Sequence, residues 1–126
     1  MSRLSLAYAR AFGPHRRMGA VRKKIGLFRT WASRHPMWAA WQVTYRCNLQ
    51  CSFCHYWQHP SRPEDELTTE QFREASERLA HWGTVFVSLA GGEPLVRDDL
   101  VEIVEAVARY HFPFITTNGW KMTPPL

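Results

Sequence analysis

The sequence has few of the features that direct a protein into or across a membrane. No apolar run approaches the ~20 residues that a membrane-spanning helix needs, and no short apolar segment with a small-residue cleavage site follows the N-terminus. Cysteine is scarce as well: all three cysteines lie between positions 47 and 54, and an odd, clustered set does not make a disulfide framework. We therefore expect a cytoplasmic protein with no membrane span, whose thiols bind a metal or a cluster.

Acidic residues are absent from the first half of the sequence, so the net charge of +5 at pH 7 belongs to a basic N-terminal segment. Val21, Ile25 and Phe28 recur at helical spacing, and Gly13-Pro14 should separate two short helical pieces. We expect residues 1–37 to form a basic, helical extension that packs weakly on the domain. An Arg-rich, acid-free start also resembles an organelle transit peptide. No recognised nucleic-acid-binding module accompanies the charge, so we do not expect a nucleic acid partner.

The rest of the sequence, residues 38–126, alternates between strand and helix patterns. Trp41, Val43 and Tyr45 alternate with polar residues, which favours a strand, and the apolar run at 85–89 is typical of a strand covered on both faces. Crossovers of this length join parallel strands in a right-handed sense, so the sequence predicts an α/β fold. The expected elements are a strand at 38–46, an irregular loop at 47–67, a helix from Thr68, a strand at 85–89, a helix from 98 that ends before Pro113, and a strand at 114–116.

Both ends of the first of these helices carry recognisable signals. Thr68 and Gln71 fit a capping box, in which each side chain bonds to the backbone N–H of the other. Gly83 supplies a left-handed stop. The residues expected to form the buried stripe of this helix are Phe72, Ala75, Leu79 and Trp82.

Three cysteines, Cys47, Cys51 and Cys54, directly follow the first strand. Three thiolates on so short a loop can converge on one face of an iron–sulfur cube, whose usual ligands are thiolates. Three ligands leave one iron open to a small molecule that binds through nitrogen and oxygen, as catalytic zinc sites also keep one position open. The same residues permit a zinc site instead, completed by His55 or His59.

Two further motifs end the second and third strands. In Gly91-Gly92-Glu93-Pro94 the glycines allow a ligand to approach the backbone closely, and Pro94 biases Glu93 towards an extended conformation. Exposed carbonyls there can accept hydrogen bonds from an ammonium group, although the motif alone would also suit a tight turn. The third strand runs into Thr116-Thr117-Asn118-Gly119, which predicts a polar turn with Gly119 at positive φ. The carboxyl ends of parallel strands, where all three motifs lie, are where such folds bind ligands.

Together the motifs resemble the radical S-adenosylmethionine (radical SAM) superfamily. Cys-Asn-Leu-Gln-Cys-Ser-Phe-Cys at 47–54 matches its CxxxCxxC signature, and GGEP and TNG follow the next two strands as in that family. The resemblance implies a partial (β/α)6 barrel with parallel strands, of which residues 38–126 would be the front half, a truncated core. It also implies that Cys47, Cys51 and Cys54 hold a [4Fe-4S] cluster. The backbone at Phe53 would contact the adenine of SAM, and Gly91, Gly92, Glu93 and Pro94 would bind its methionine amino group.

The activity implied by the resemblance is reductive cleavage of SAM. The reduced cluster would yield methionine and a 5′-deoxyadenosyl radical, which abstracts hydrogen from an unknown substrate, either a small molecule or a peptide. An electron donor such as a flavodoxin or a ferredoxin would reduce the cluster. Two alternatives are a non-catalytic module that binds zinc or a cluster, and an inactive truncated remnant whose open sheet exposes an edge. Arg46 and Arg62 could approach the SAM carboxylate, but we interpret them as solvated.

Overall fold

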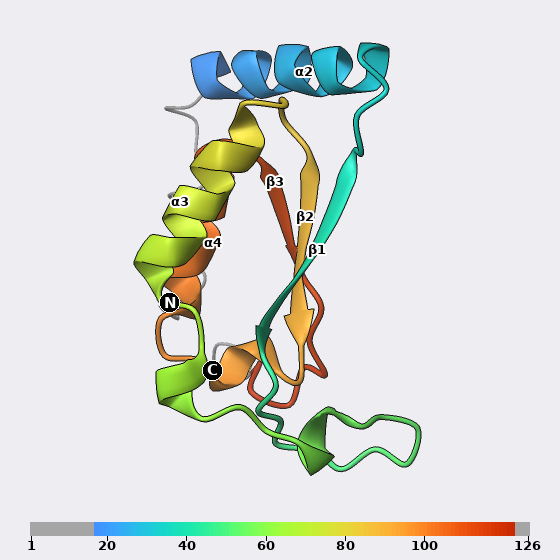
Figure 1. Cartoon of the computed structure of the whole chain (residues 1–126), viewed down its shortest axis with the longest axis vertical. Coiled ribbons are helices and arrows are strands. Elements are labelled where there is room, and N and C mark those ends of the chain that lie inside the picture. The colour runs from blue at the N-terminus through green and yellow to red at the C-terminus, as the bar shows by residue number, and fades with distance from the viewer. Residues whose placement is uncertain (1–16, 123–126) are drawn as a thin grey trace.

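A computed structural model describes residues 17–122 of the chain (Figure 1). In this part a three-stranded sheet has the order β1-β2-β3, and both strand pairs are parallel. This arrangement confirms the predicted α/β fold. The expected break at Gly13-Pro14 lies outside the described residues. The elements are α2 (Arg17–Ala32), β1 (Trp38–Thr44), the short 3-10 helices η2 (Tyr56–Gln58) and η3 (Pro63–Asp65), α3 (Thr69–Ala80), β2 (Phe86–Gly91), the 3-10 helix η4 (Pro94–Val96), α4 (Leu100–Ala108) and β3 (Phe112–Ile115).

The strand ends differ from the sequence-based bounds. β1 stops at Thr44, whose hydroxyl accepts a hydrogen bond from the Arg46 N–H and so turns the chain two residues earlier than expected. β2 continues to Gly91, which lies opposite Thr44 after a shift in register. β3 begins at Phe112 and includes Pro113, because an edge strand tolerates a missing N–H on its unpaired side.

The core lies between the sheet and the helices α3 and α4, which cover one face (Figure 1). The capping box of α3 is present in full, and Gly83 has a φ of 128°, so both predicted end signals are confirmed. Trp82 is 61% exposed, which contradicts its place in the buried stripe. Because α3 ends at Ala80, Trp82 lies in the turn beyond it and no longer follows the helix face. The buried core residues are Val43, Phe72, Val85, Val87, Leu89, Leu100, Ile103, Val104 and Val107.

The other face of the sheet carries a cluster of aromatic rings at the beginning of its strands. The rings of Trp38 and Phe114 stack with their centroids 5.8 Å apart. The Phe86 ring contacts both of them and also the ring of Phe112. Trp38 is 57% exposed and Phe114 is 48% exposed. Within residues 17–122 no helix covers this face, as the expected open sheet implies (Figure 1).

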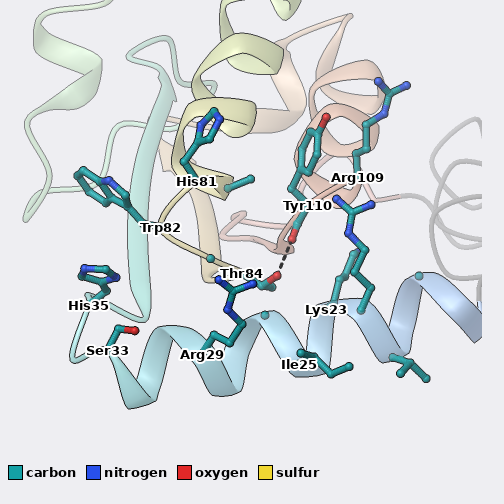
Figure 2. A pocket seen from close by; sticks show the side chains of 16 residues that line it. Lys23, Ile25, Arg29, Ser33, His35, His81, Trp82, Thr84, Arg109 and Tyr110 are labelled. Carbon is teal, nitrogen blue, oxygen red and sulfur yellow. Dashed lines mark hydrogen bonds between the residues drawn. The ribbon is translucent and has the colours of Figure 1, made fainter.

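Helix α2 crosses the amino ends of the strands, at the opposite end of the sheet from the motif loops (Figure 1). It contacts the domain through small residues: Thr30 donates to the Thr84 carbonyl at 2.9 Å, and Gly26 lies against the Thr84 side chain. An open cleft of about 770 Å³ beside it is lined by cations that include Arg29 and Arg109 (Figure 2). No helix in the described part of the chain is long and apolar enough to cross a bilayer.

His111 is a buried histidine that joins the start of β3 to α3. Its Nε2 lies 2.9 Å from the Ser76 carbonyl and its Nδ1 lies 3.3 Å from the Val85 N–H. A neutral ring that donates from Nε2 and accepts at Nδ1 satisfies both contacts. Burial lowers the pKa of His111 and the charge of Lys23 adds to this, which together outweigh the bond to Ser76 that acts the other way.

We predict that the free energy of unfolding falls as the pH is lowered from about 7.5 to about 5.5. Because the folded-state pKa of His111 lies below the unfolded value of about 6.5, the unfolded chain binds the proton first. The stabilisation is therefore complete above the unfolded pKa and is lost progressively below it. Urea unfolding at the two pH values measures the loss. His111→Gln should flatten it and His81→Gln, an exposed control, should retain it; equal pH dependence in wild type and His111→Gln would contradict the assignment.

Candidate functional site

The three cysteines lie on the loop between β1 and α3, at the carboxyl edge of the sheet. All three are free and partly buried. The Cys51 carbonyl accepts hydrogen bonds from the Cys54 N–H at 3.2 Å and from the Trp57 indole N–H at 3.1 Å. The Cys47 sulfur accepts from the Leu49 N–H at 3.5 Å. The loop is therefore folded around its cysteines, with three thiols at the edge where ligands bind in such folds.

This donor set suits an iron–sulfur cluster in chemistry and in location. Within residues 17–122, no group of three or more His, Cys, Asp or Glu side chains is arranged to hold a metal ion. Binding would therefore have to draw the three partly exposed thiols together. His55 and His59 are both exposed, and His55 lies 3.3 Å from the Gln58 side chain.

The glycine turn after β2 packs directly against the end of β1. The Gly92 N–H donates to the Thr44 carbonyl at 2.8 Å, and the Glu93 N–H donates to the Arg46 carbonyl at 2.9 Å. A Cβ on Gly91 would overlap the Thr44 carbonyl, and one on Gly92 would overlap the Arg46 carbonyl. Gly91 also has a φ of 124°, which L side chains rarely adopt. The two glycines thus have a packing role that the sequence did not indicate: they fix the residue that precedes Cys47.

The Glu93 carboxylate is fully buried and links the second motif to the third. Its Oε1 accepts from the Leu95 N–H at 2.9 Å and from the Thr117 hydroxyl at 2.7 Å, and its Oε2 accepts from the Asn118 N–H at 2.7 Å. Glu93 is extended, as expected for a residue before a proline, and Pro94 begins η4. The Glu93 side chain therefore holds the turn at 116–119 in place through buried hydrogen bonds.

The third motif reaches back to the cysteine loop. Gly119 has a φ of 75°, which confirms the predicted turn. The Asn118 side-chain amide donates to the side chain of Asn48 at 2.9 Å, and Asn48 lies between the first two cysteines. Phe53 contributes an 87% exposed ring on the same loop. All three motif loops are thus joined, through Glu93 and Asn118.

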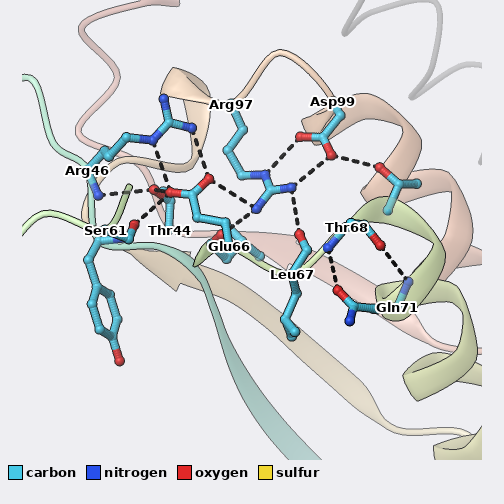
Figure 3. Close-up of polar contacts among 12 residues, drawn as sticks. Thr44, Arg46, Ser61, Glu66, Leu67, Thr68, Gln71, Arg97 and Asp99 are labelled. Carbon is cyan, nitrogen blue, oxygen red and sulfur yellow. Dashed lines mark hydrogen bonds and ion pairs between the residues drawn. The ribbon is translucent and has the colours of Figure 1, made fainter. Parts of the chain in front are cut away.

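The sequence did not predict a network of four charged side chains, in which Glu66 and Arg97 are buried and Arg46 and Asp99 are partly exposed (Figure 3). Arg46, which we interpreted as solvated, forms a double hydrogen bond with Glu66 at 3.0 Å. Burial alone would raise the pKa of Glu66, but hydrogen bonds from Arg46 and from neighbouring hydroxyls outweigh it and lower the pKa. Hydrogen bonds from Arg97 similarly lower the pKa of Asp99. No local pattern marks Glu66, because its arginine partners Arg46 and Arg97 lie 20 and 31 positions away. Arg97 and Asp99 are only two positions apart, but their pairing was not predicted either.

Comparison with known proteins identifies the family of the chain. The family model described as "Radical SAM superfamily" matches residues 41–125. The chain is similar to "Mycofactocin maturase MftC" from Mycolicibacterium smegmatis and from Mycobacterium tuberculosis strain H37Rv, with 34% identity over 90 residues in each case. These matches cover 71% of this chain and 23% of the relatives, so the chain spans less than a quarter of their length. No solved structure matches the chain.

We predict that Gly92→Ala destabilises the chain by about 1–3 kcal/mol, since the added Cβ forces the Arg46 carbonyl away. Urea unfolding measures the total loss. Backbone hydrogen exchange at residues 92 and 93 should rise, because their bonds to β1 weaken, while the Thr116 amide should not change. Gly119→Ala is the matched control: nothing lies within 4 Å of its Cβ, so it bears only the strain of positive φ. Unaltered exchange at 92 and 93 in Gly92→Ala would refute the packing role.

Proposed function

Since the chain belongs to the radical SAM superfamily, we propose that its cysteine loop binds a [4Fe-4S] cluster beside a molecule of S-adenosylmethionine. The observation that carries the proposal is the meeting of three motif loops at one edge of a parallel sheet. Those loops are joined to one another by the side chains of Glu93 and Asn118. An isolated cysteine-rich metal module would have no need of the two other loops.

The thiolates of Cys47, Cys51 and Cys54 would each ligate one iron, which leaves the fourth iron open to a chelating ligand. When bound, the cluster supplies the electron that splits SAM into methionine and a 5′-deoxyadenosyl radical, which takes hydrogen from the substrate. The identity of that substrate, a small molecule or a peptide, is left open.

The residues of the glycine turn would orient SAM rather than react with it. Both Glu93 oxygens already accept hydrogen bonds within the chain. We therefore assign the methionine amino group to the backbone of Gly91, Gly92 and Glu93, with Pro94 fixing the exit of the turn. The backbone at Phe53 would lie against the adenine, next to the third cysteine.

The electron would come from a separate donor, such as a flavodoxin or a ferredoxin. The same chemistry favours a reducing compartment such as the cytoplasm, because the thiols must stay free of disulfides to bind iron.

We predict that anaerobic reconstitution with iron and sulfide loads about four irons per chain, since three thiolates hold one cube. Adding SAM should change the absorption and electron paramagnetic resonance (EPR) spectra, and reduction should then release methionine and 5′-deoxyadenosine. Cys47→Ala, Cys51→Ala and Cys54→Ala should each abolish the cluster.

Ser52→Ala, an exposed position in the same loop, is the matched control and should load iron like the wild type. Stoichiometric zinc without a spectral response to SAM would favour a metal-binding module instead. Absence of any iron–sulfur centre in the wild type would overturn the proposal.

A further inference from the structure

The base of the cysteine loop is closed by one buried carboxylate, that of Glu66 (Figure 3). Its Oε1 accepts from the Thr44 hydroxyl, from Arg46 Nε at 3.0 Å and from the Ser61 hydroxyl at 2.7 Å. Its Oε2 accepts from Arg46 Nη2 at 3.0 Å and from Arg97 Nη1 at 3.3 Å. Thr44 and Arg46 stand just before the first cysteine, whereas Glu66 stands after the last. The carboxylate therefore joins the two ends of the segment that carries the thiols.

Arg97 anchors this carboxylate to the fixed part of the fold. Its Nη1 donates to the Val43 carbonyl at 2.8 Å as well as to Glu66, and its Nη2 donates to the Leu67 carbonyl at 2.9 Å. Nε donates to one carboxylate oxygen of Asp99 and Nη2 donates to the other, both at 2.8 Å. These contacts occupy all five N–H donors of a guanidinium whose side chain is 5% exposed. The group is held from several sides and cannot move without breaking buried bonds.

The network is balanced in charge, with two guanidinium groups facing two carboxylates. The side chains of Glu66 and Arg97 are each 5% exposed, and burying them carries a large desolvation cost that their attraction only partly offsets. A buried ion network is therefore weak evidence for added stability. Removal of the Glu66 carboxylate is nevertheless costly, because the Arg97 guanidinium beside it stays buried with one charged partner fewer. A network of this kind stabilises one arrangement of its side chains relative to others. Here that arrangement sets the positions of the two ends of the cysteine loop.

We propose that Glu66 is a positioning residue for the cluster site: its carboxylate holds both ends of the loop so that the three thiols can meet on one cube. The inference rests on the proposed function and adds to it a residue outside the three motifs. Glu66 touches neither the cluster nor SAM in this assignment. It acts through the side chains of Thr44 and Arg46, which precede Cys47. It also acts through Ser61, whose hydroxyl accepts from the Tyr45 N–H at 3.1 Å.

The first test is hydrogen exchange on the full chain under reducing conditions without iron. Glu66→Gln keeps the shape of the side chain but replaces an accepting oxygen by a donor. Amides between residues 45 and 61 should then exchange about tenfold faster or more, as expected for a lost hydrogen bond to a charged group. Amides that pair β2 with β3 should not change.

Asp65→Asn is the matched control, because it removes the neighbouring carboxylate, which bonds only the exposed Arg62 among the described residues. It should leave exchange in the loop unchanged. Equal exchange in Glu66→Gln and wild type would overturn the proposal. Should Glu66→Gln fail to fold, Arg46→Gln takes its place, since it removes two of the bonds to Glu66 and leaves Arg97 with Asp99.

The second test concerns the cluster, after reconstitution of the same variants. Glu66→Gln should hold less than about half of the wild-type iron, or give an altered EPR signal, because loosely held ends spread the three thiols. Asp65→Asn should match the wild type in both. Wild-type iron content and EPR signal in Glu66→Gln would overturn the positioning role. A wild type without iron would refute the proposed function, and the exchange experiment alone would then decide whether Glu66 holds the loop.

Discussion

The close approach of the glycine turn to the end of β1 is the contact on which the rest of the site depends. Gly92 and Glu93 donate their N–H groups to carbonyls on either side of Tyr45, and only residues without a Cβ at 91 and 92 let the two segments come so near. The register shift that sets Thr44 opposite Gly91 belongs to the same contact. It places the first cysteine directly beside the second motif. The distance between the two motifs is therefore fixed by backbone packing, before any ligand binds.

Two buried carboxylates extend this constraint to the other loops. Glu93 accepts three hydrogen bonds, two of which tie the turn at 116–119 to the glycine turn. Glu66 accepts five, four of which come from Thr44, Arg46 and Ser61 and close the cysteine loop. Both carboxylates are shielded from water, which costs free energy. Their hydrogen bonds offset this cost only when every donor is in place. A site built in this way is stiff at its base, while the thiols above it remain partly exposed.

The sequence predicted those features whose signal is local. The capping box at Thr68, the extended Glu93 before Pro94 and the positive φ of Gly83 depend on neighbours within a few positions, and all are confirmed. The order of strands and helices follows from periodicity in the same way. Trp82 was placed wrongly because helical spacing was continued past the end of α3. The roles of Glu66 and Arg97 could not be predicted, since Glu66 depends on Arg46 and Arg97 depends on Val43, partners that only the folded sheet brings near.

The groups that stabilise the sheet and the groups that form the site lie at opposite ends of the strands. His111, α2 and the aromatic cluster of Trp38 lie at the amino ends of the strands, whereas the motif loops lie at the carboxyl ends (Figure 1). Among the described residues, a basic cluster lies at the first of these ends, because α2 contains five cations and no acid. That charge lies a full strand length from the thiols, so it contributes little through water to their electrostatics. The electrostatics near the cysteine loop are set instead by the balanced pairs of Arg46 with Glu66 and Arg97 with Asp99, which bring opposite charges together within 3.0 Å.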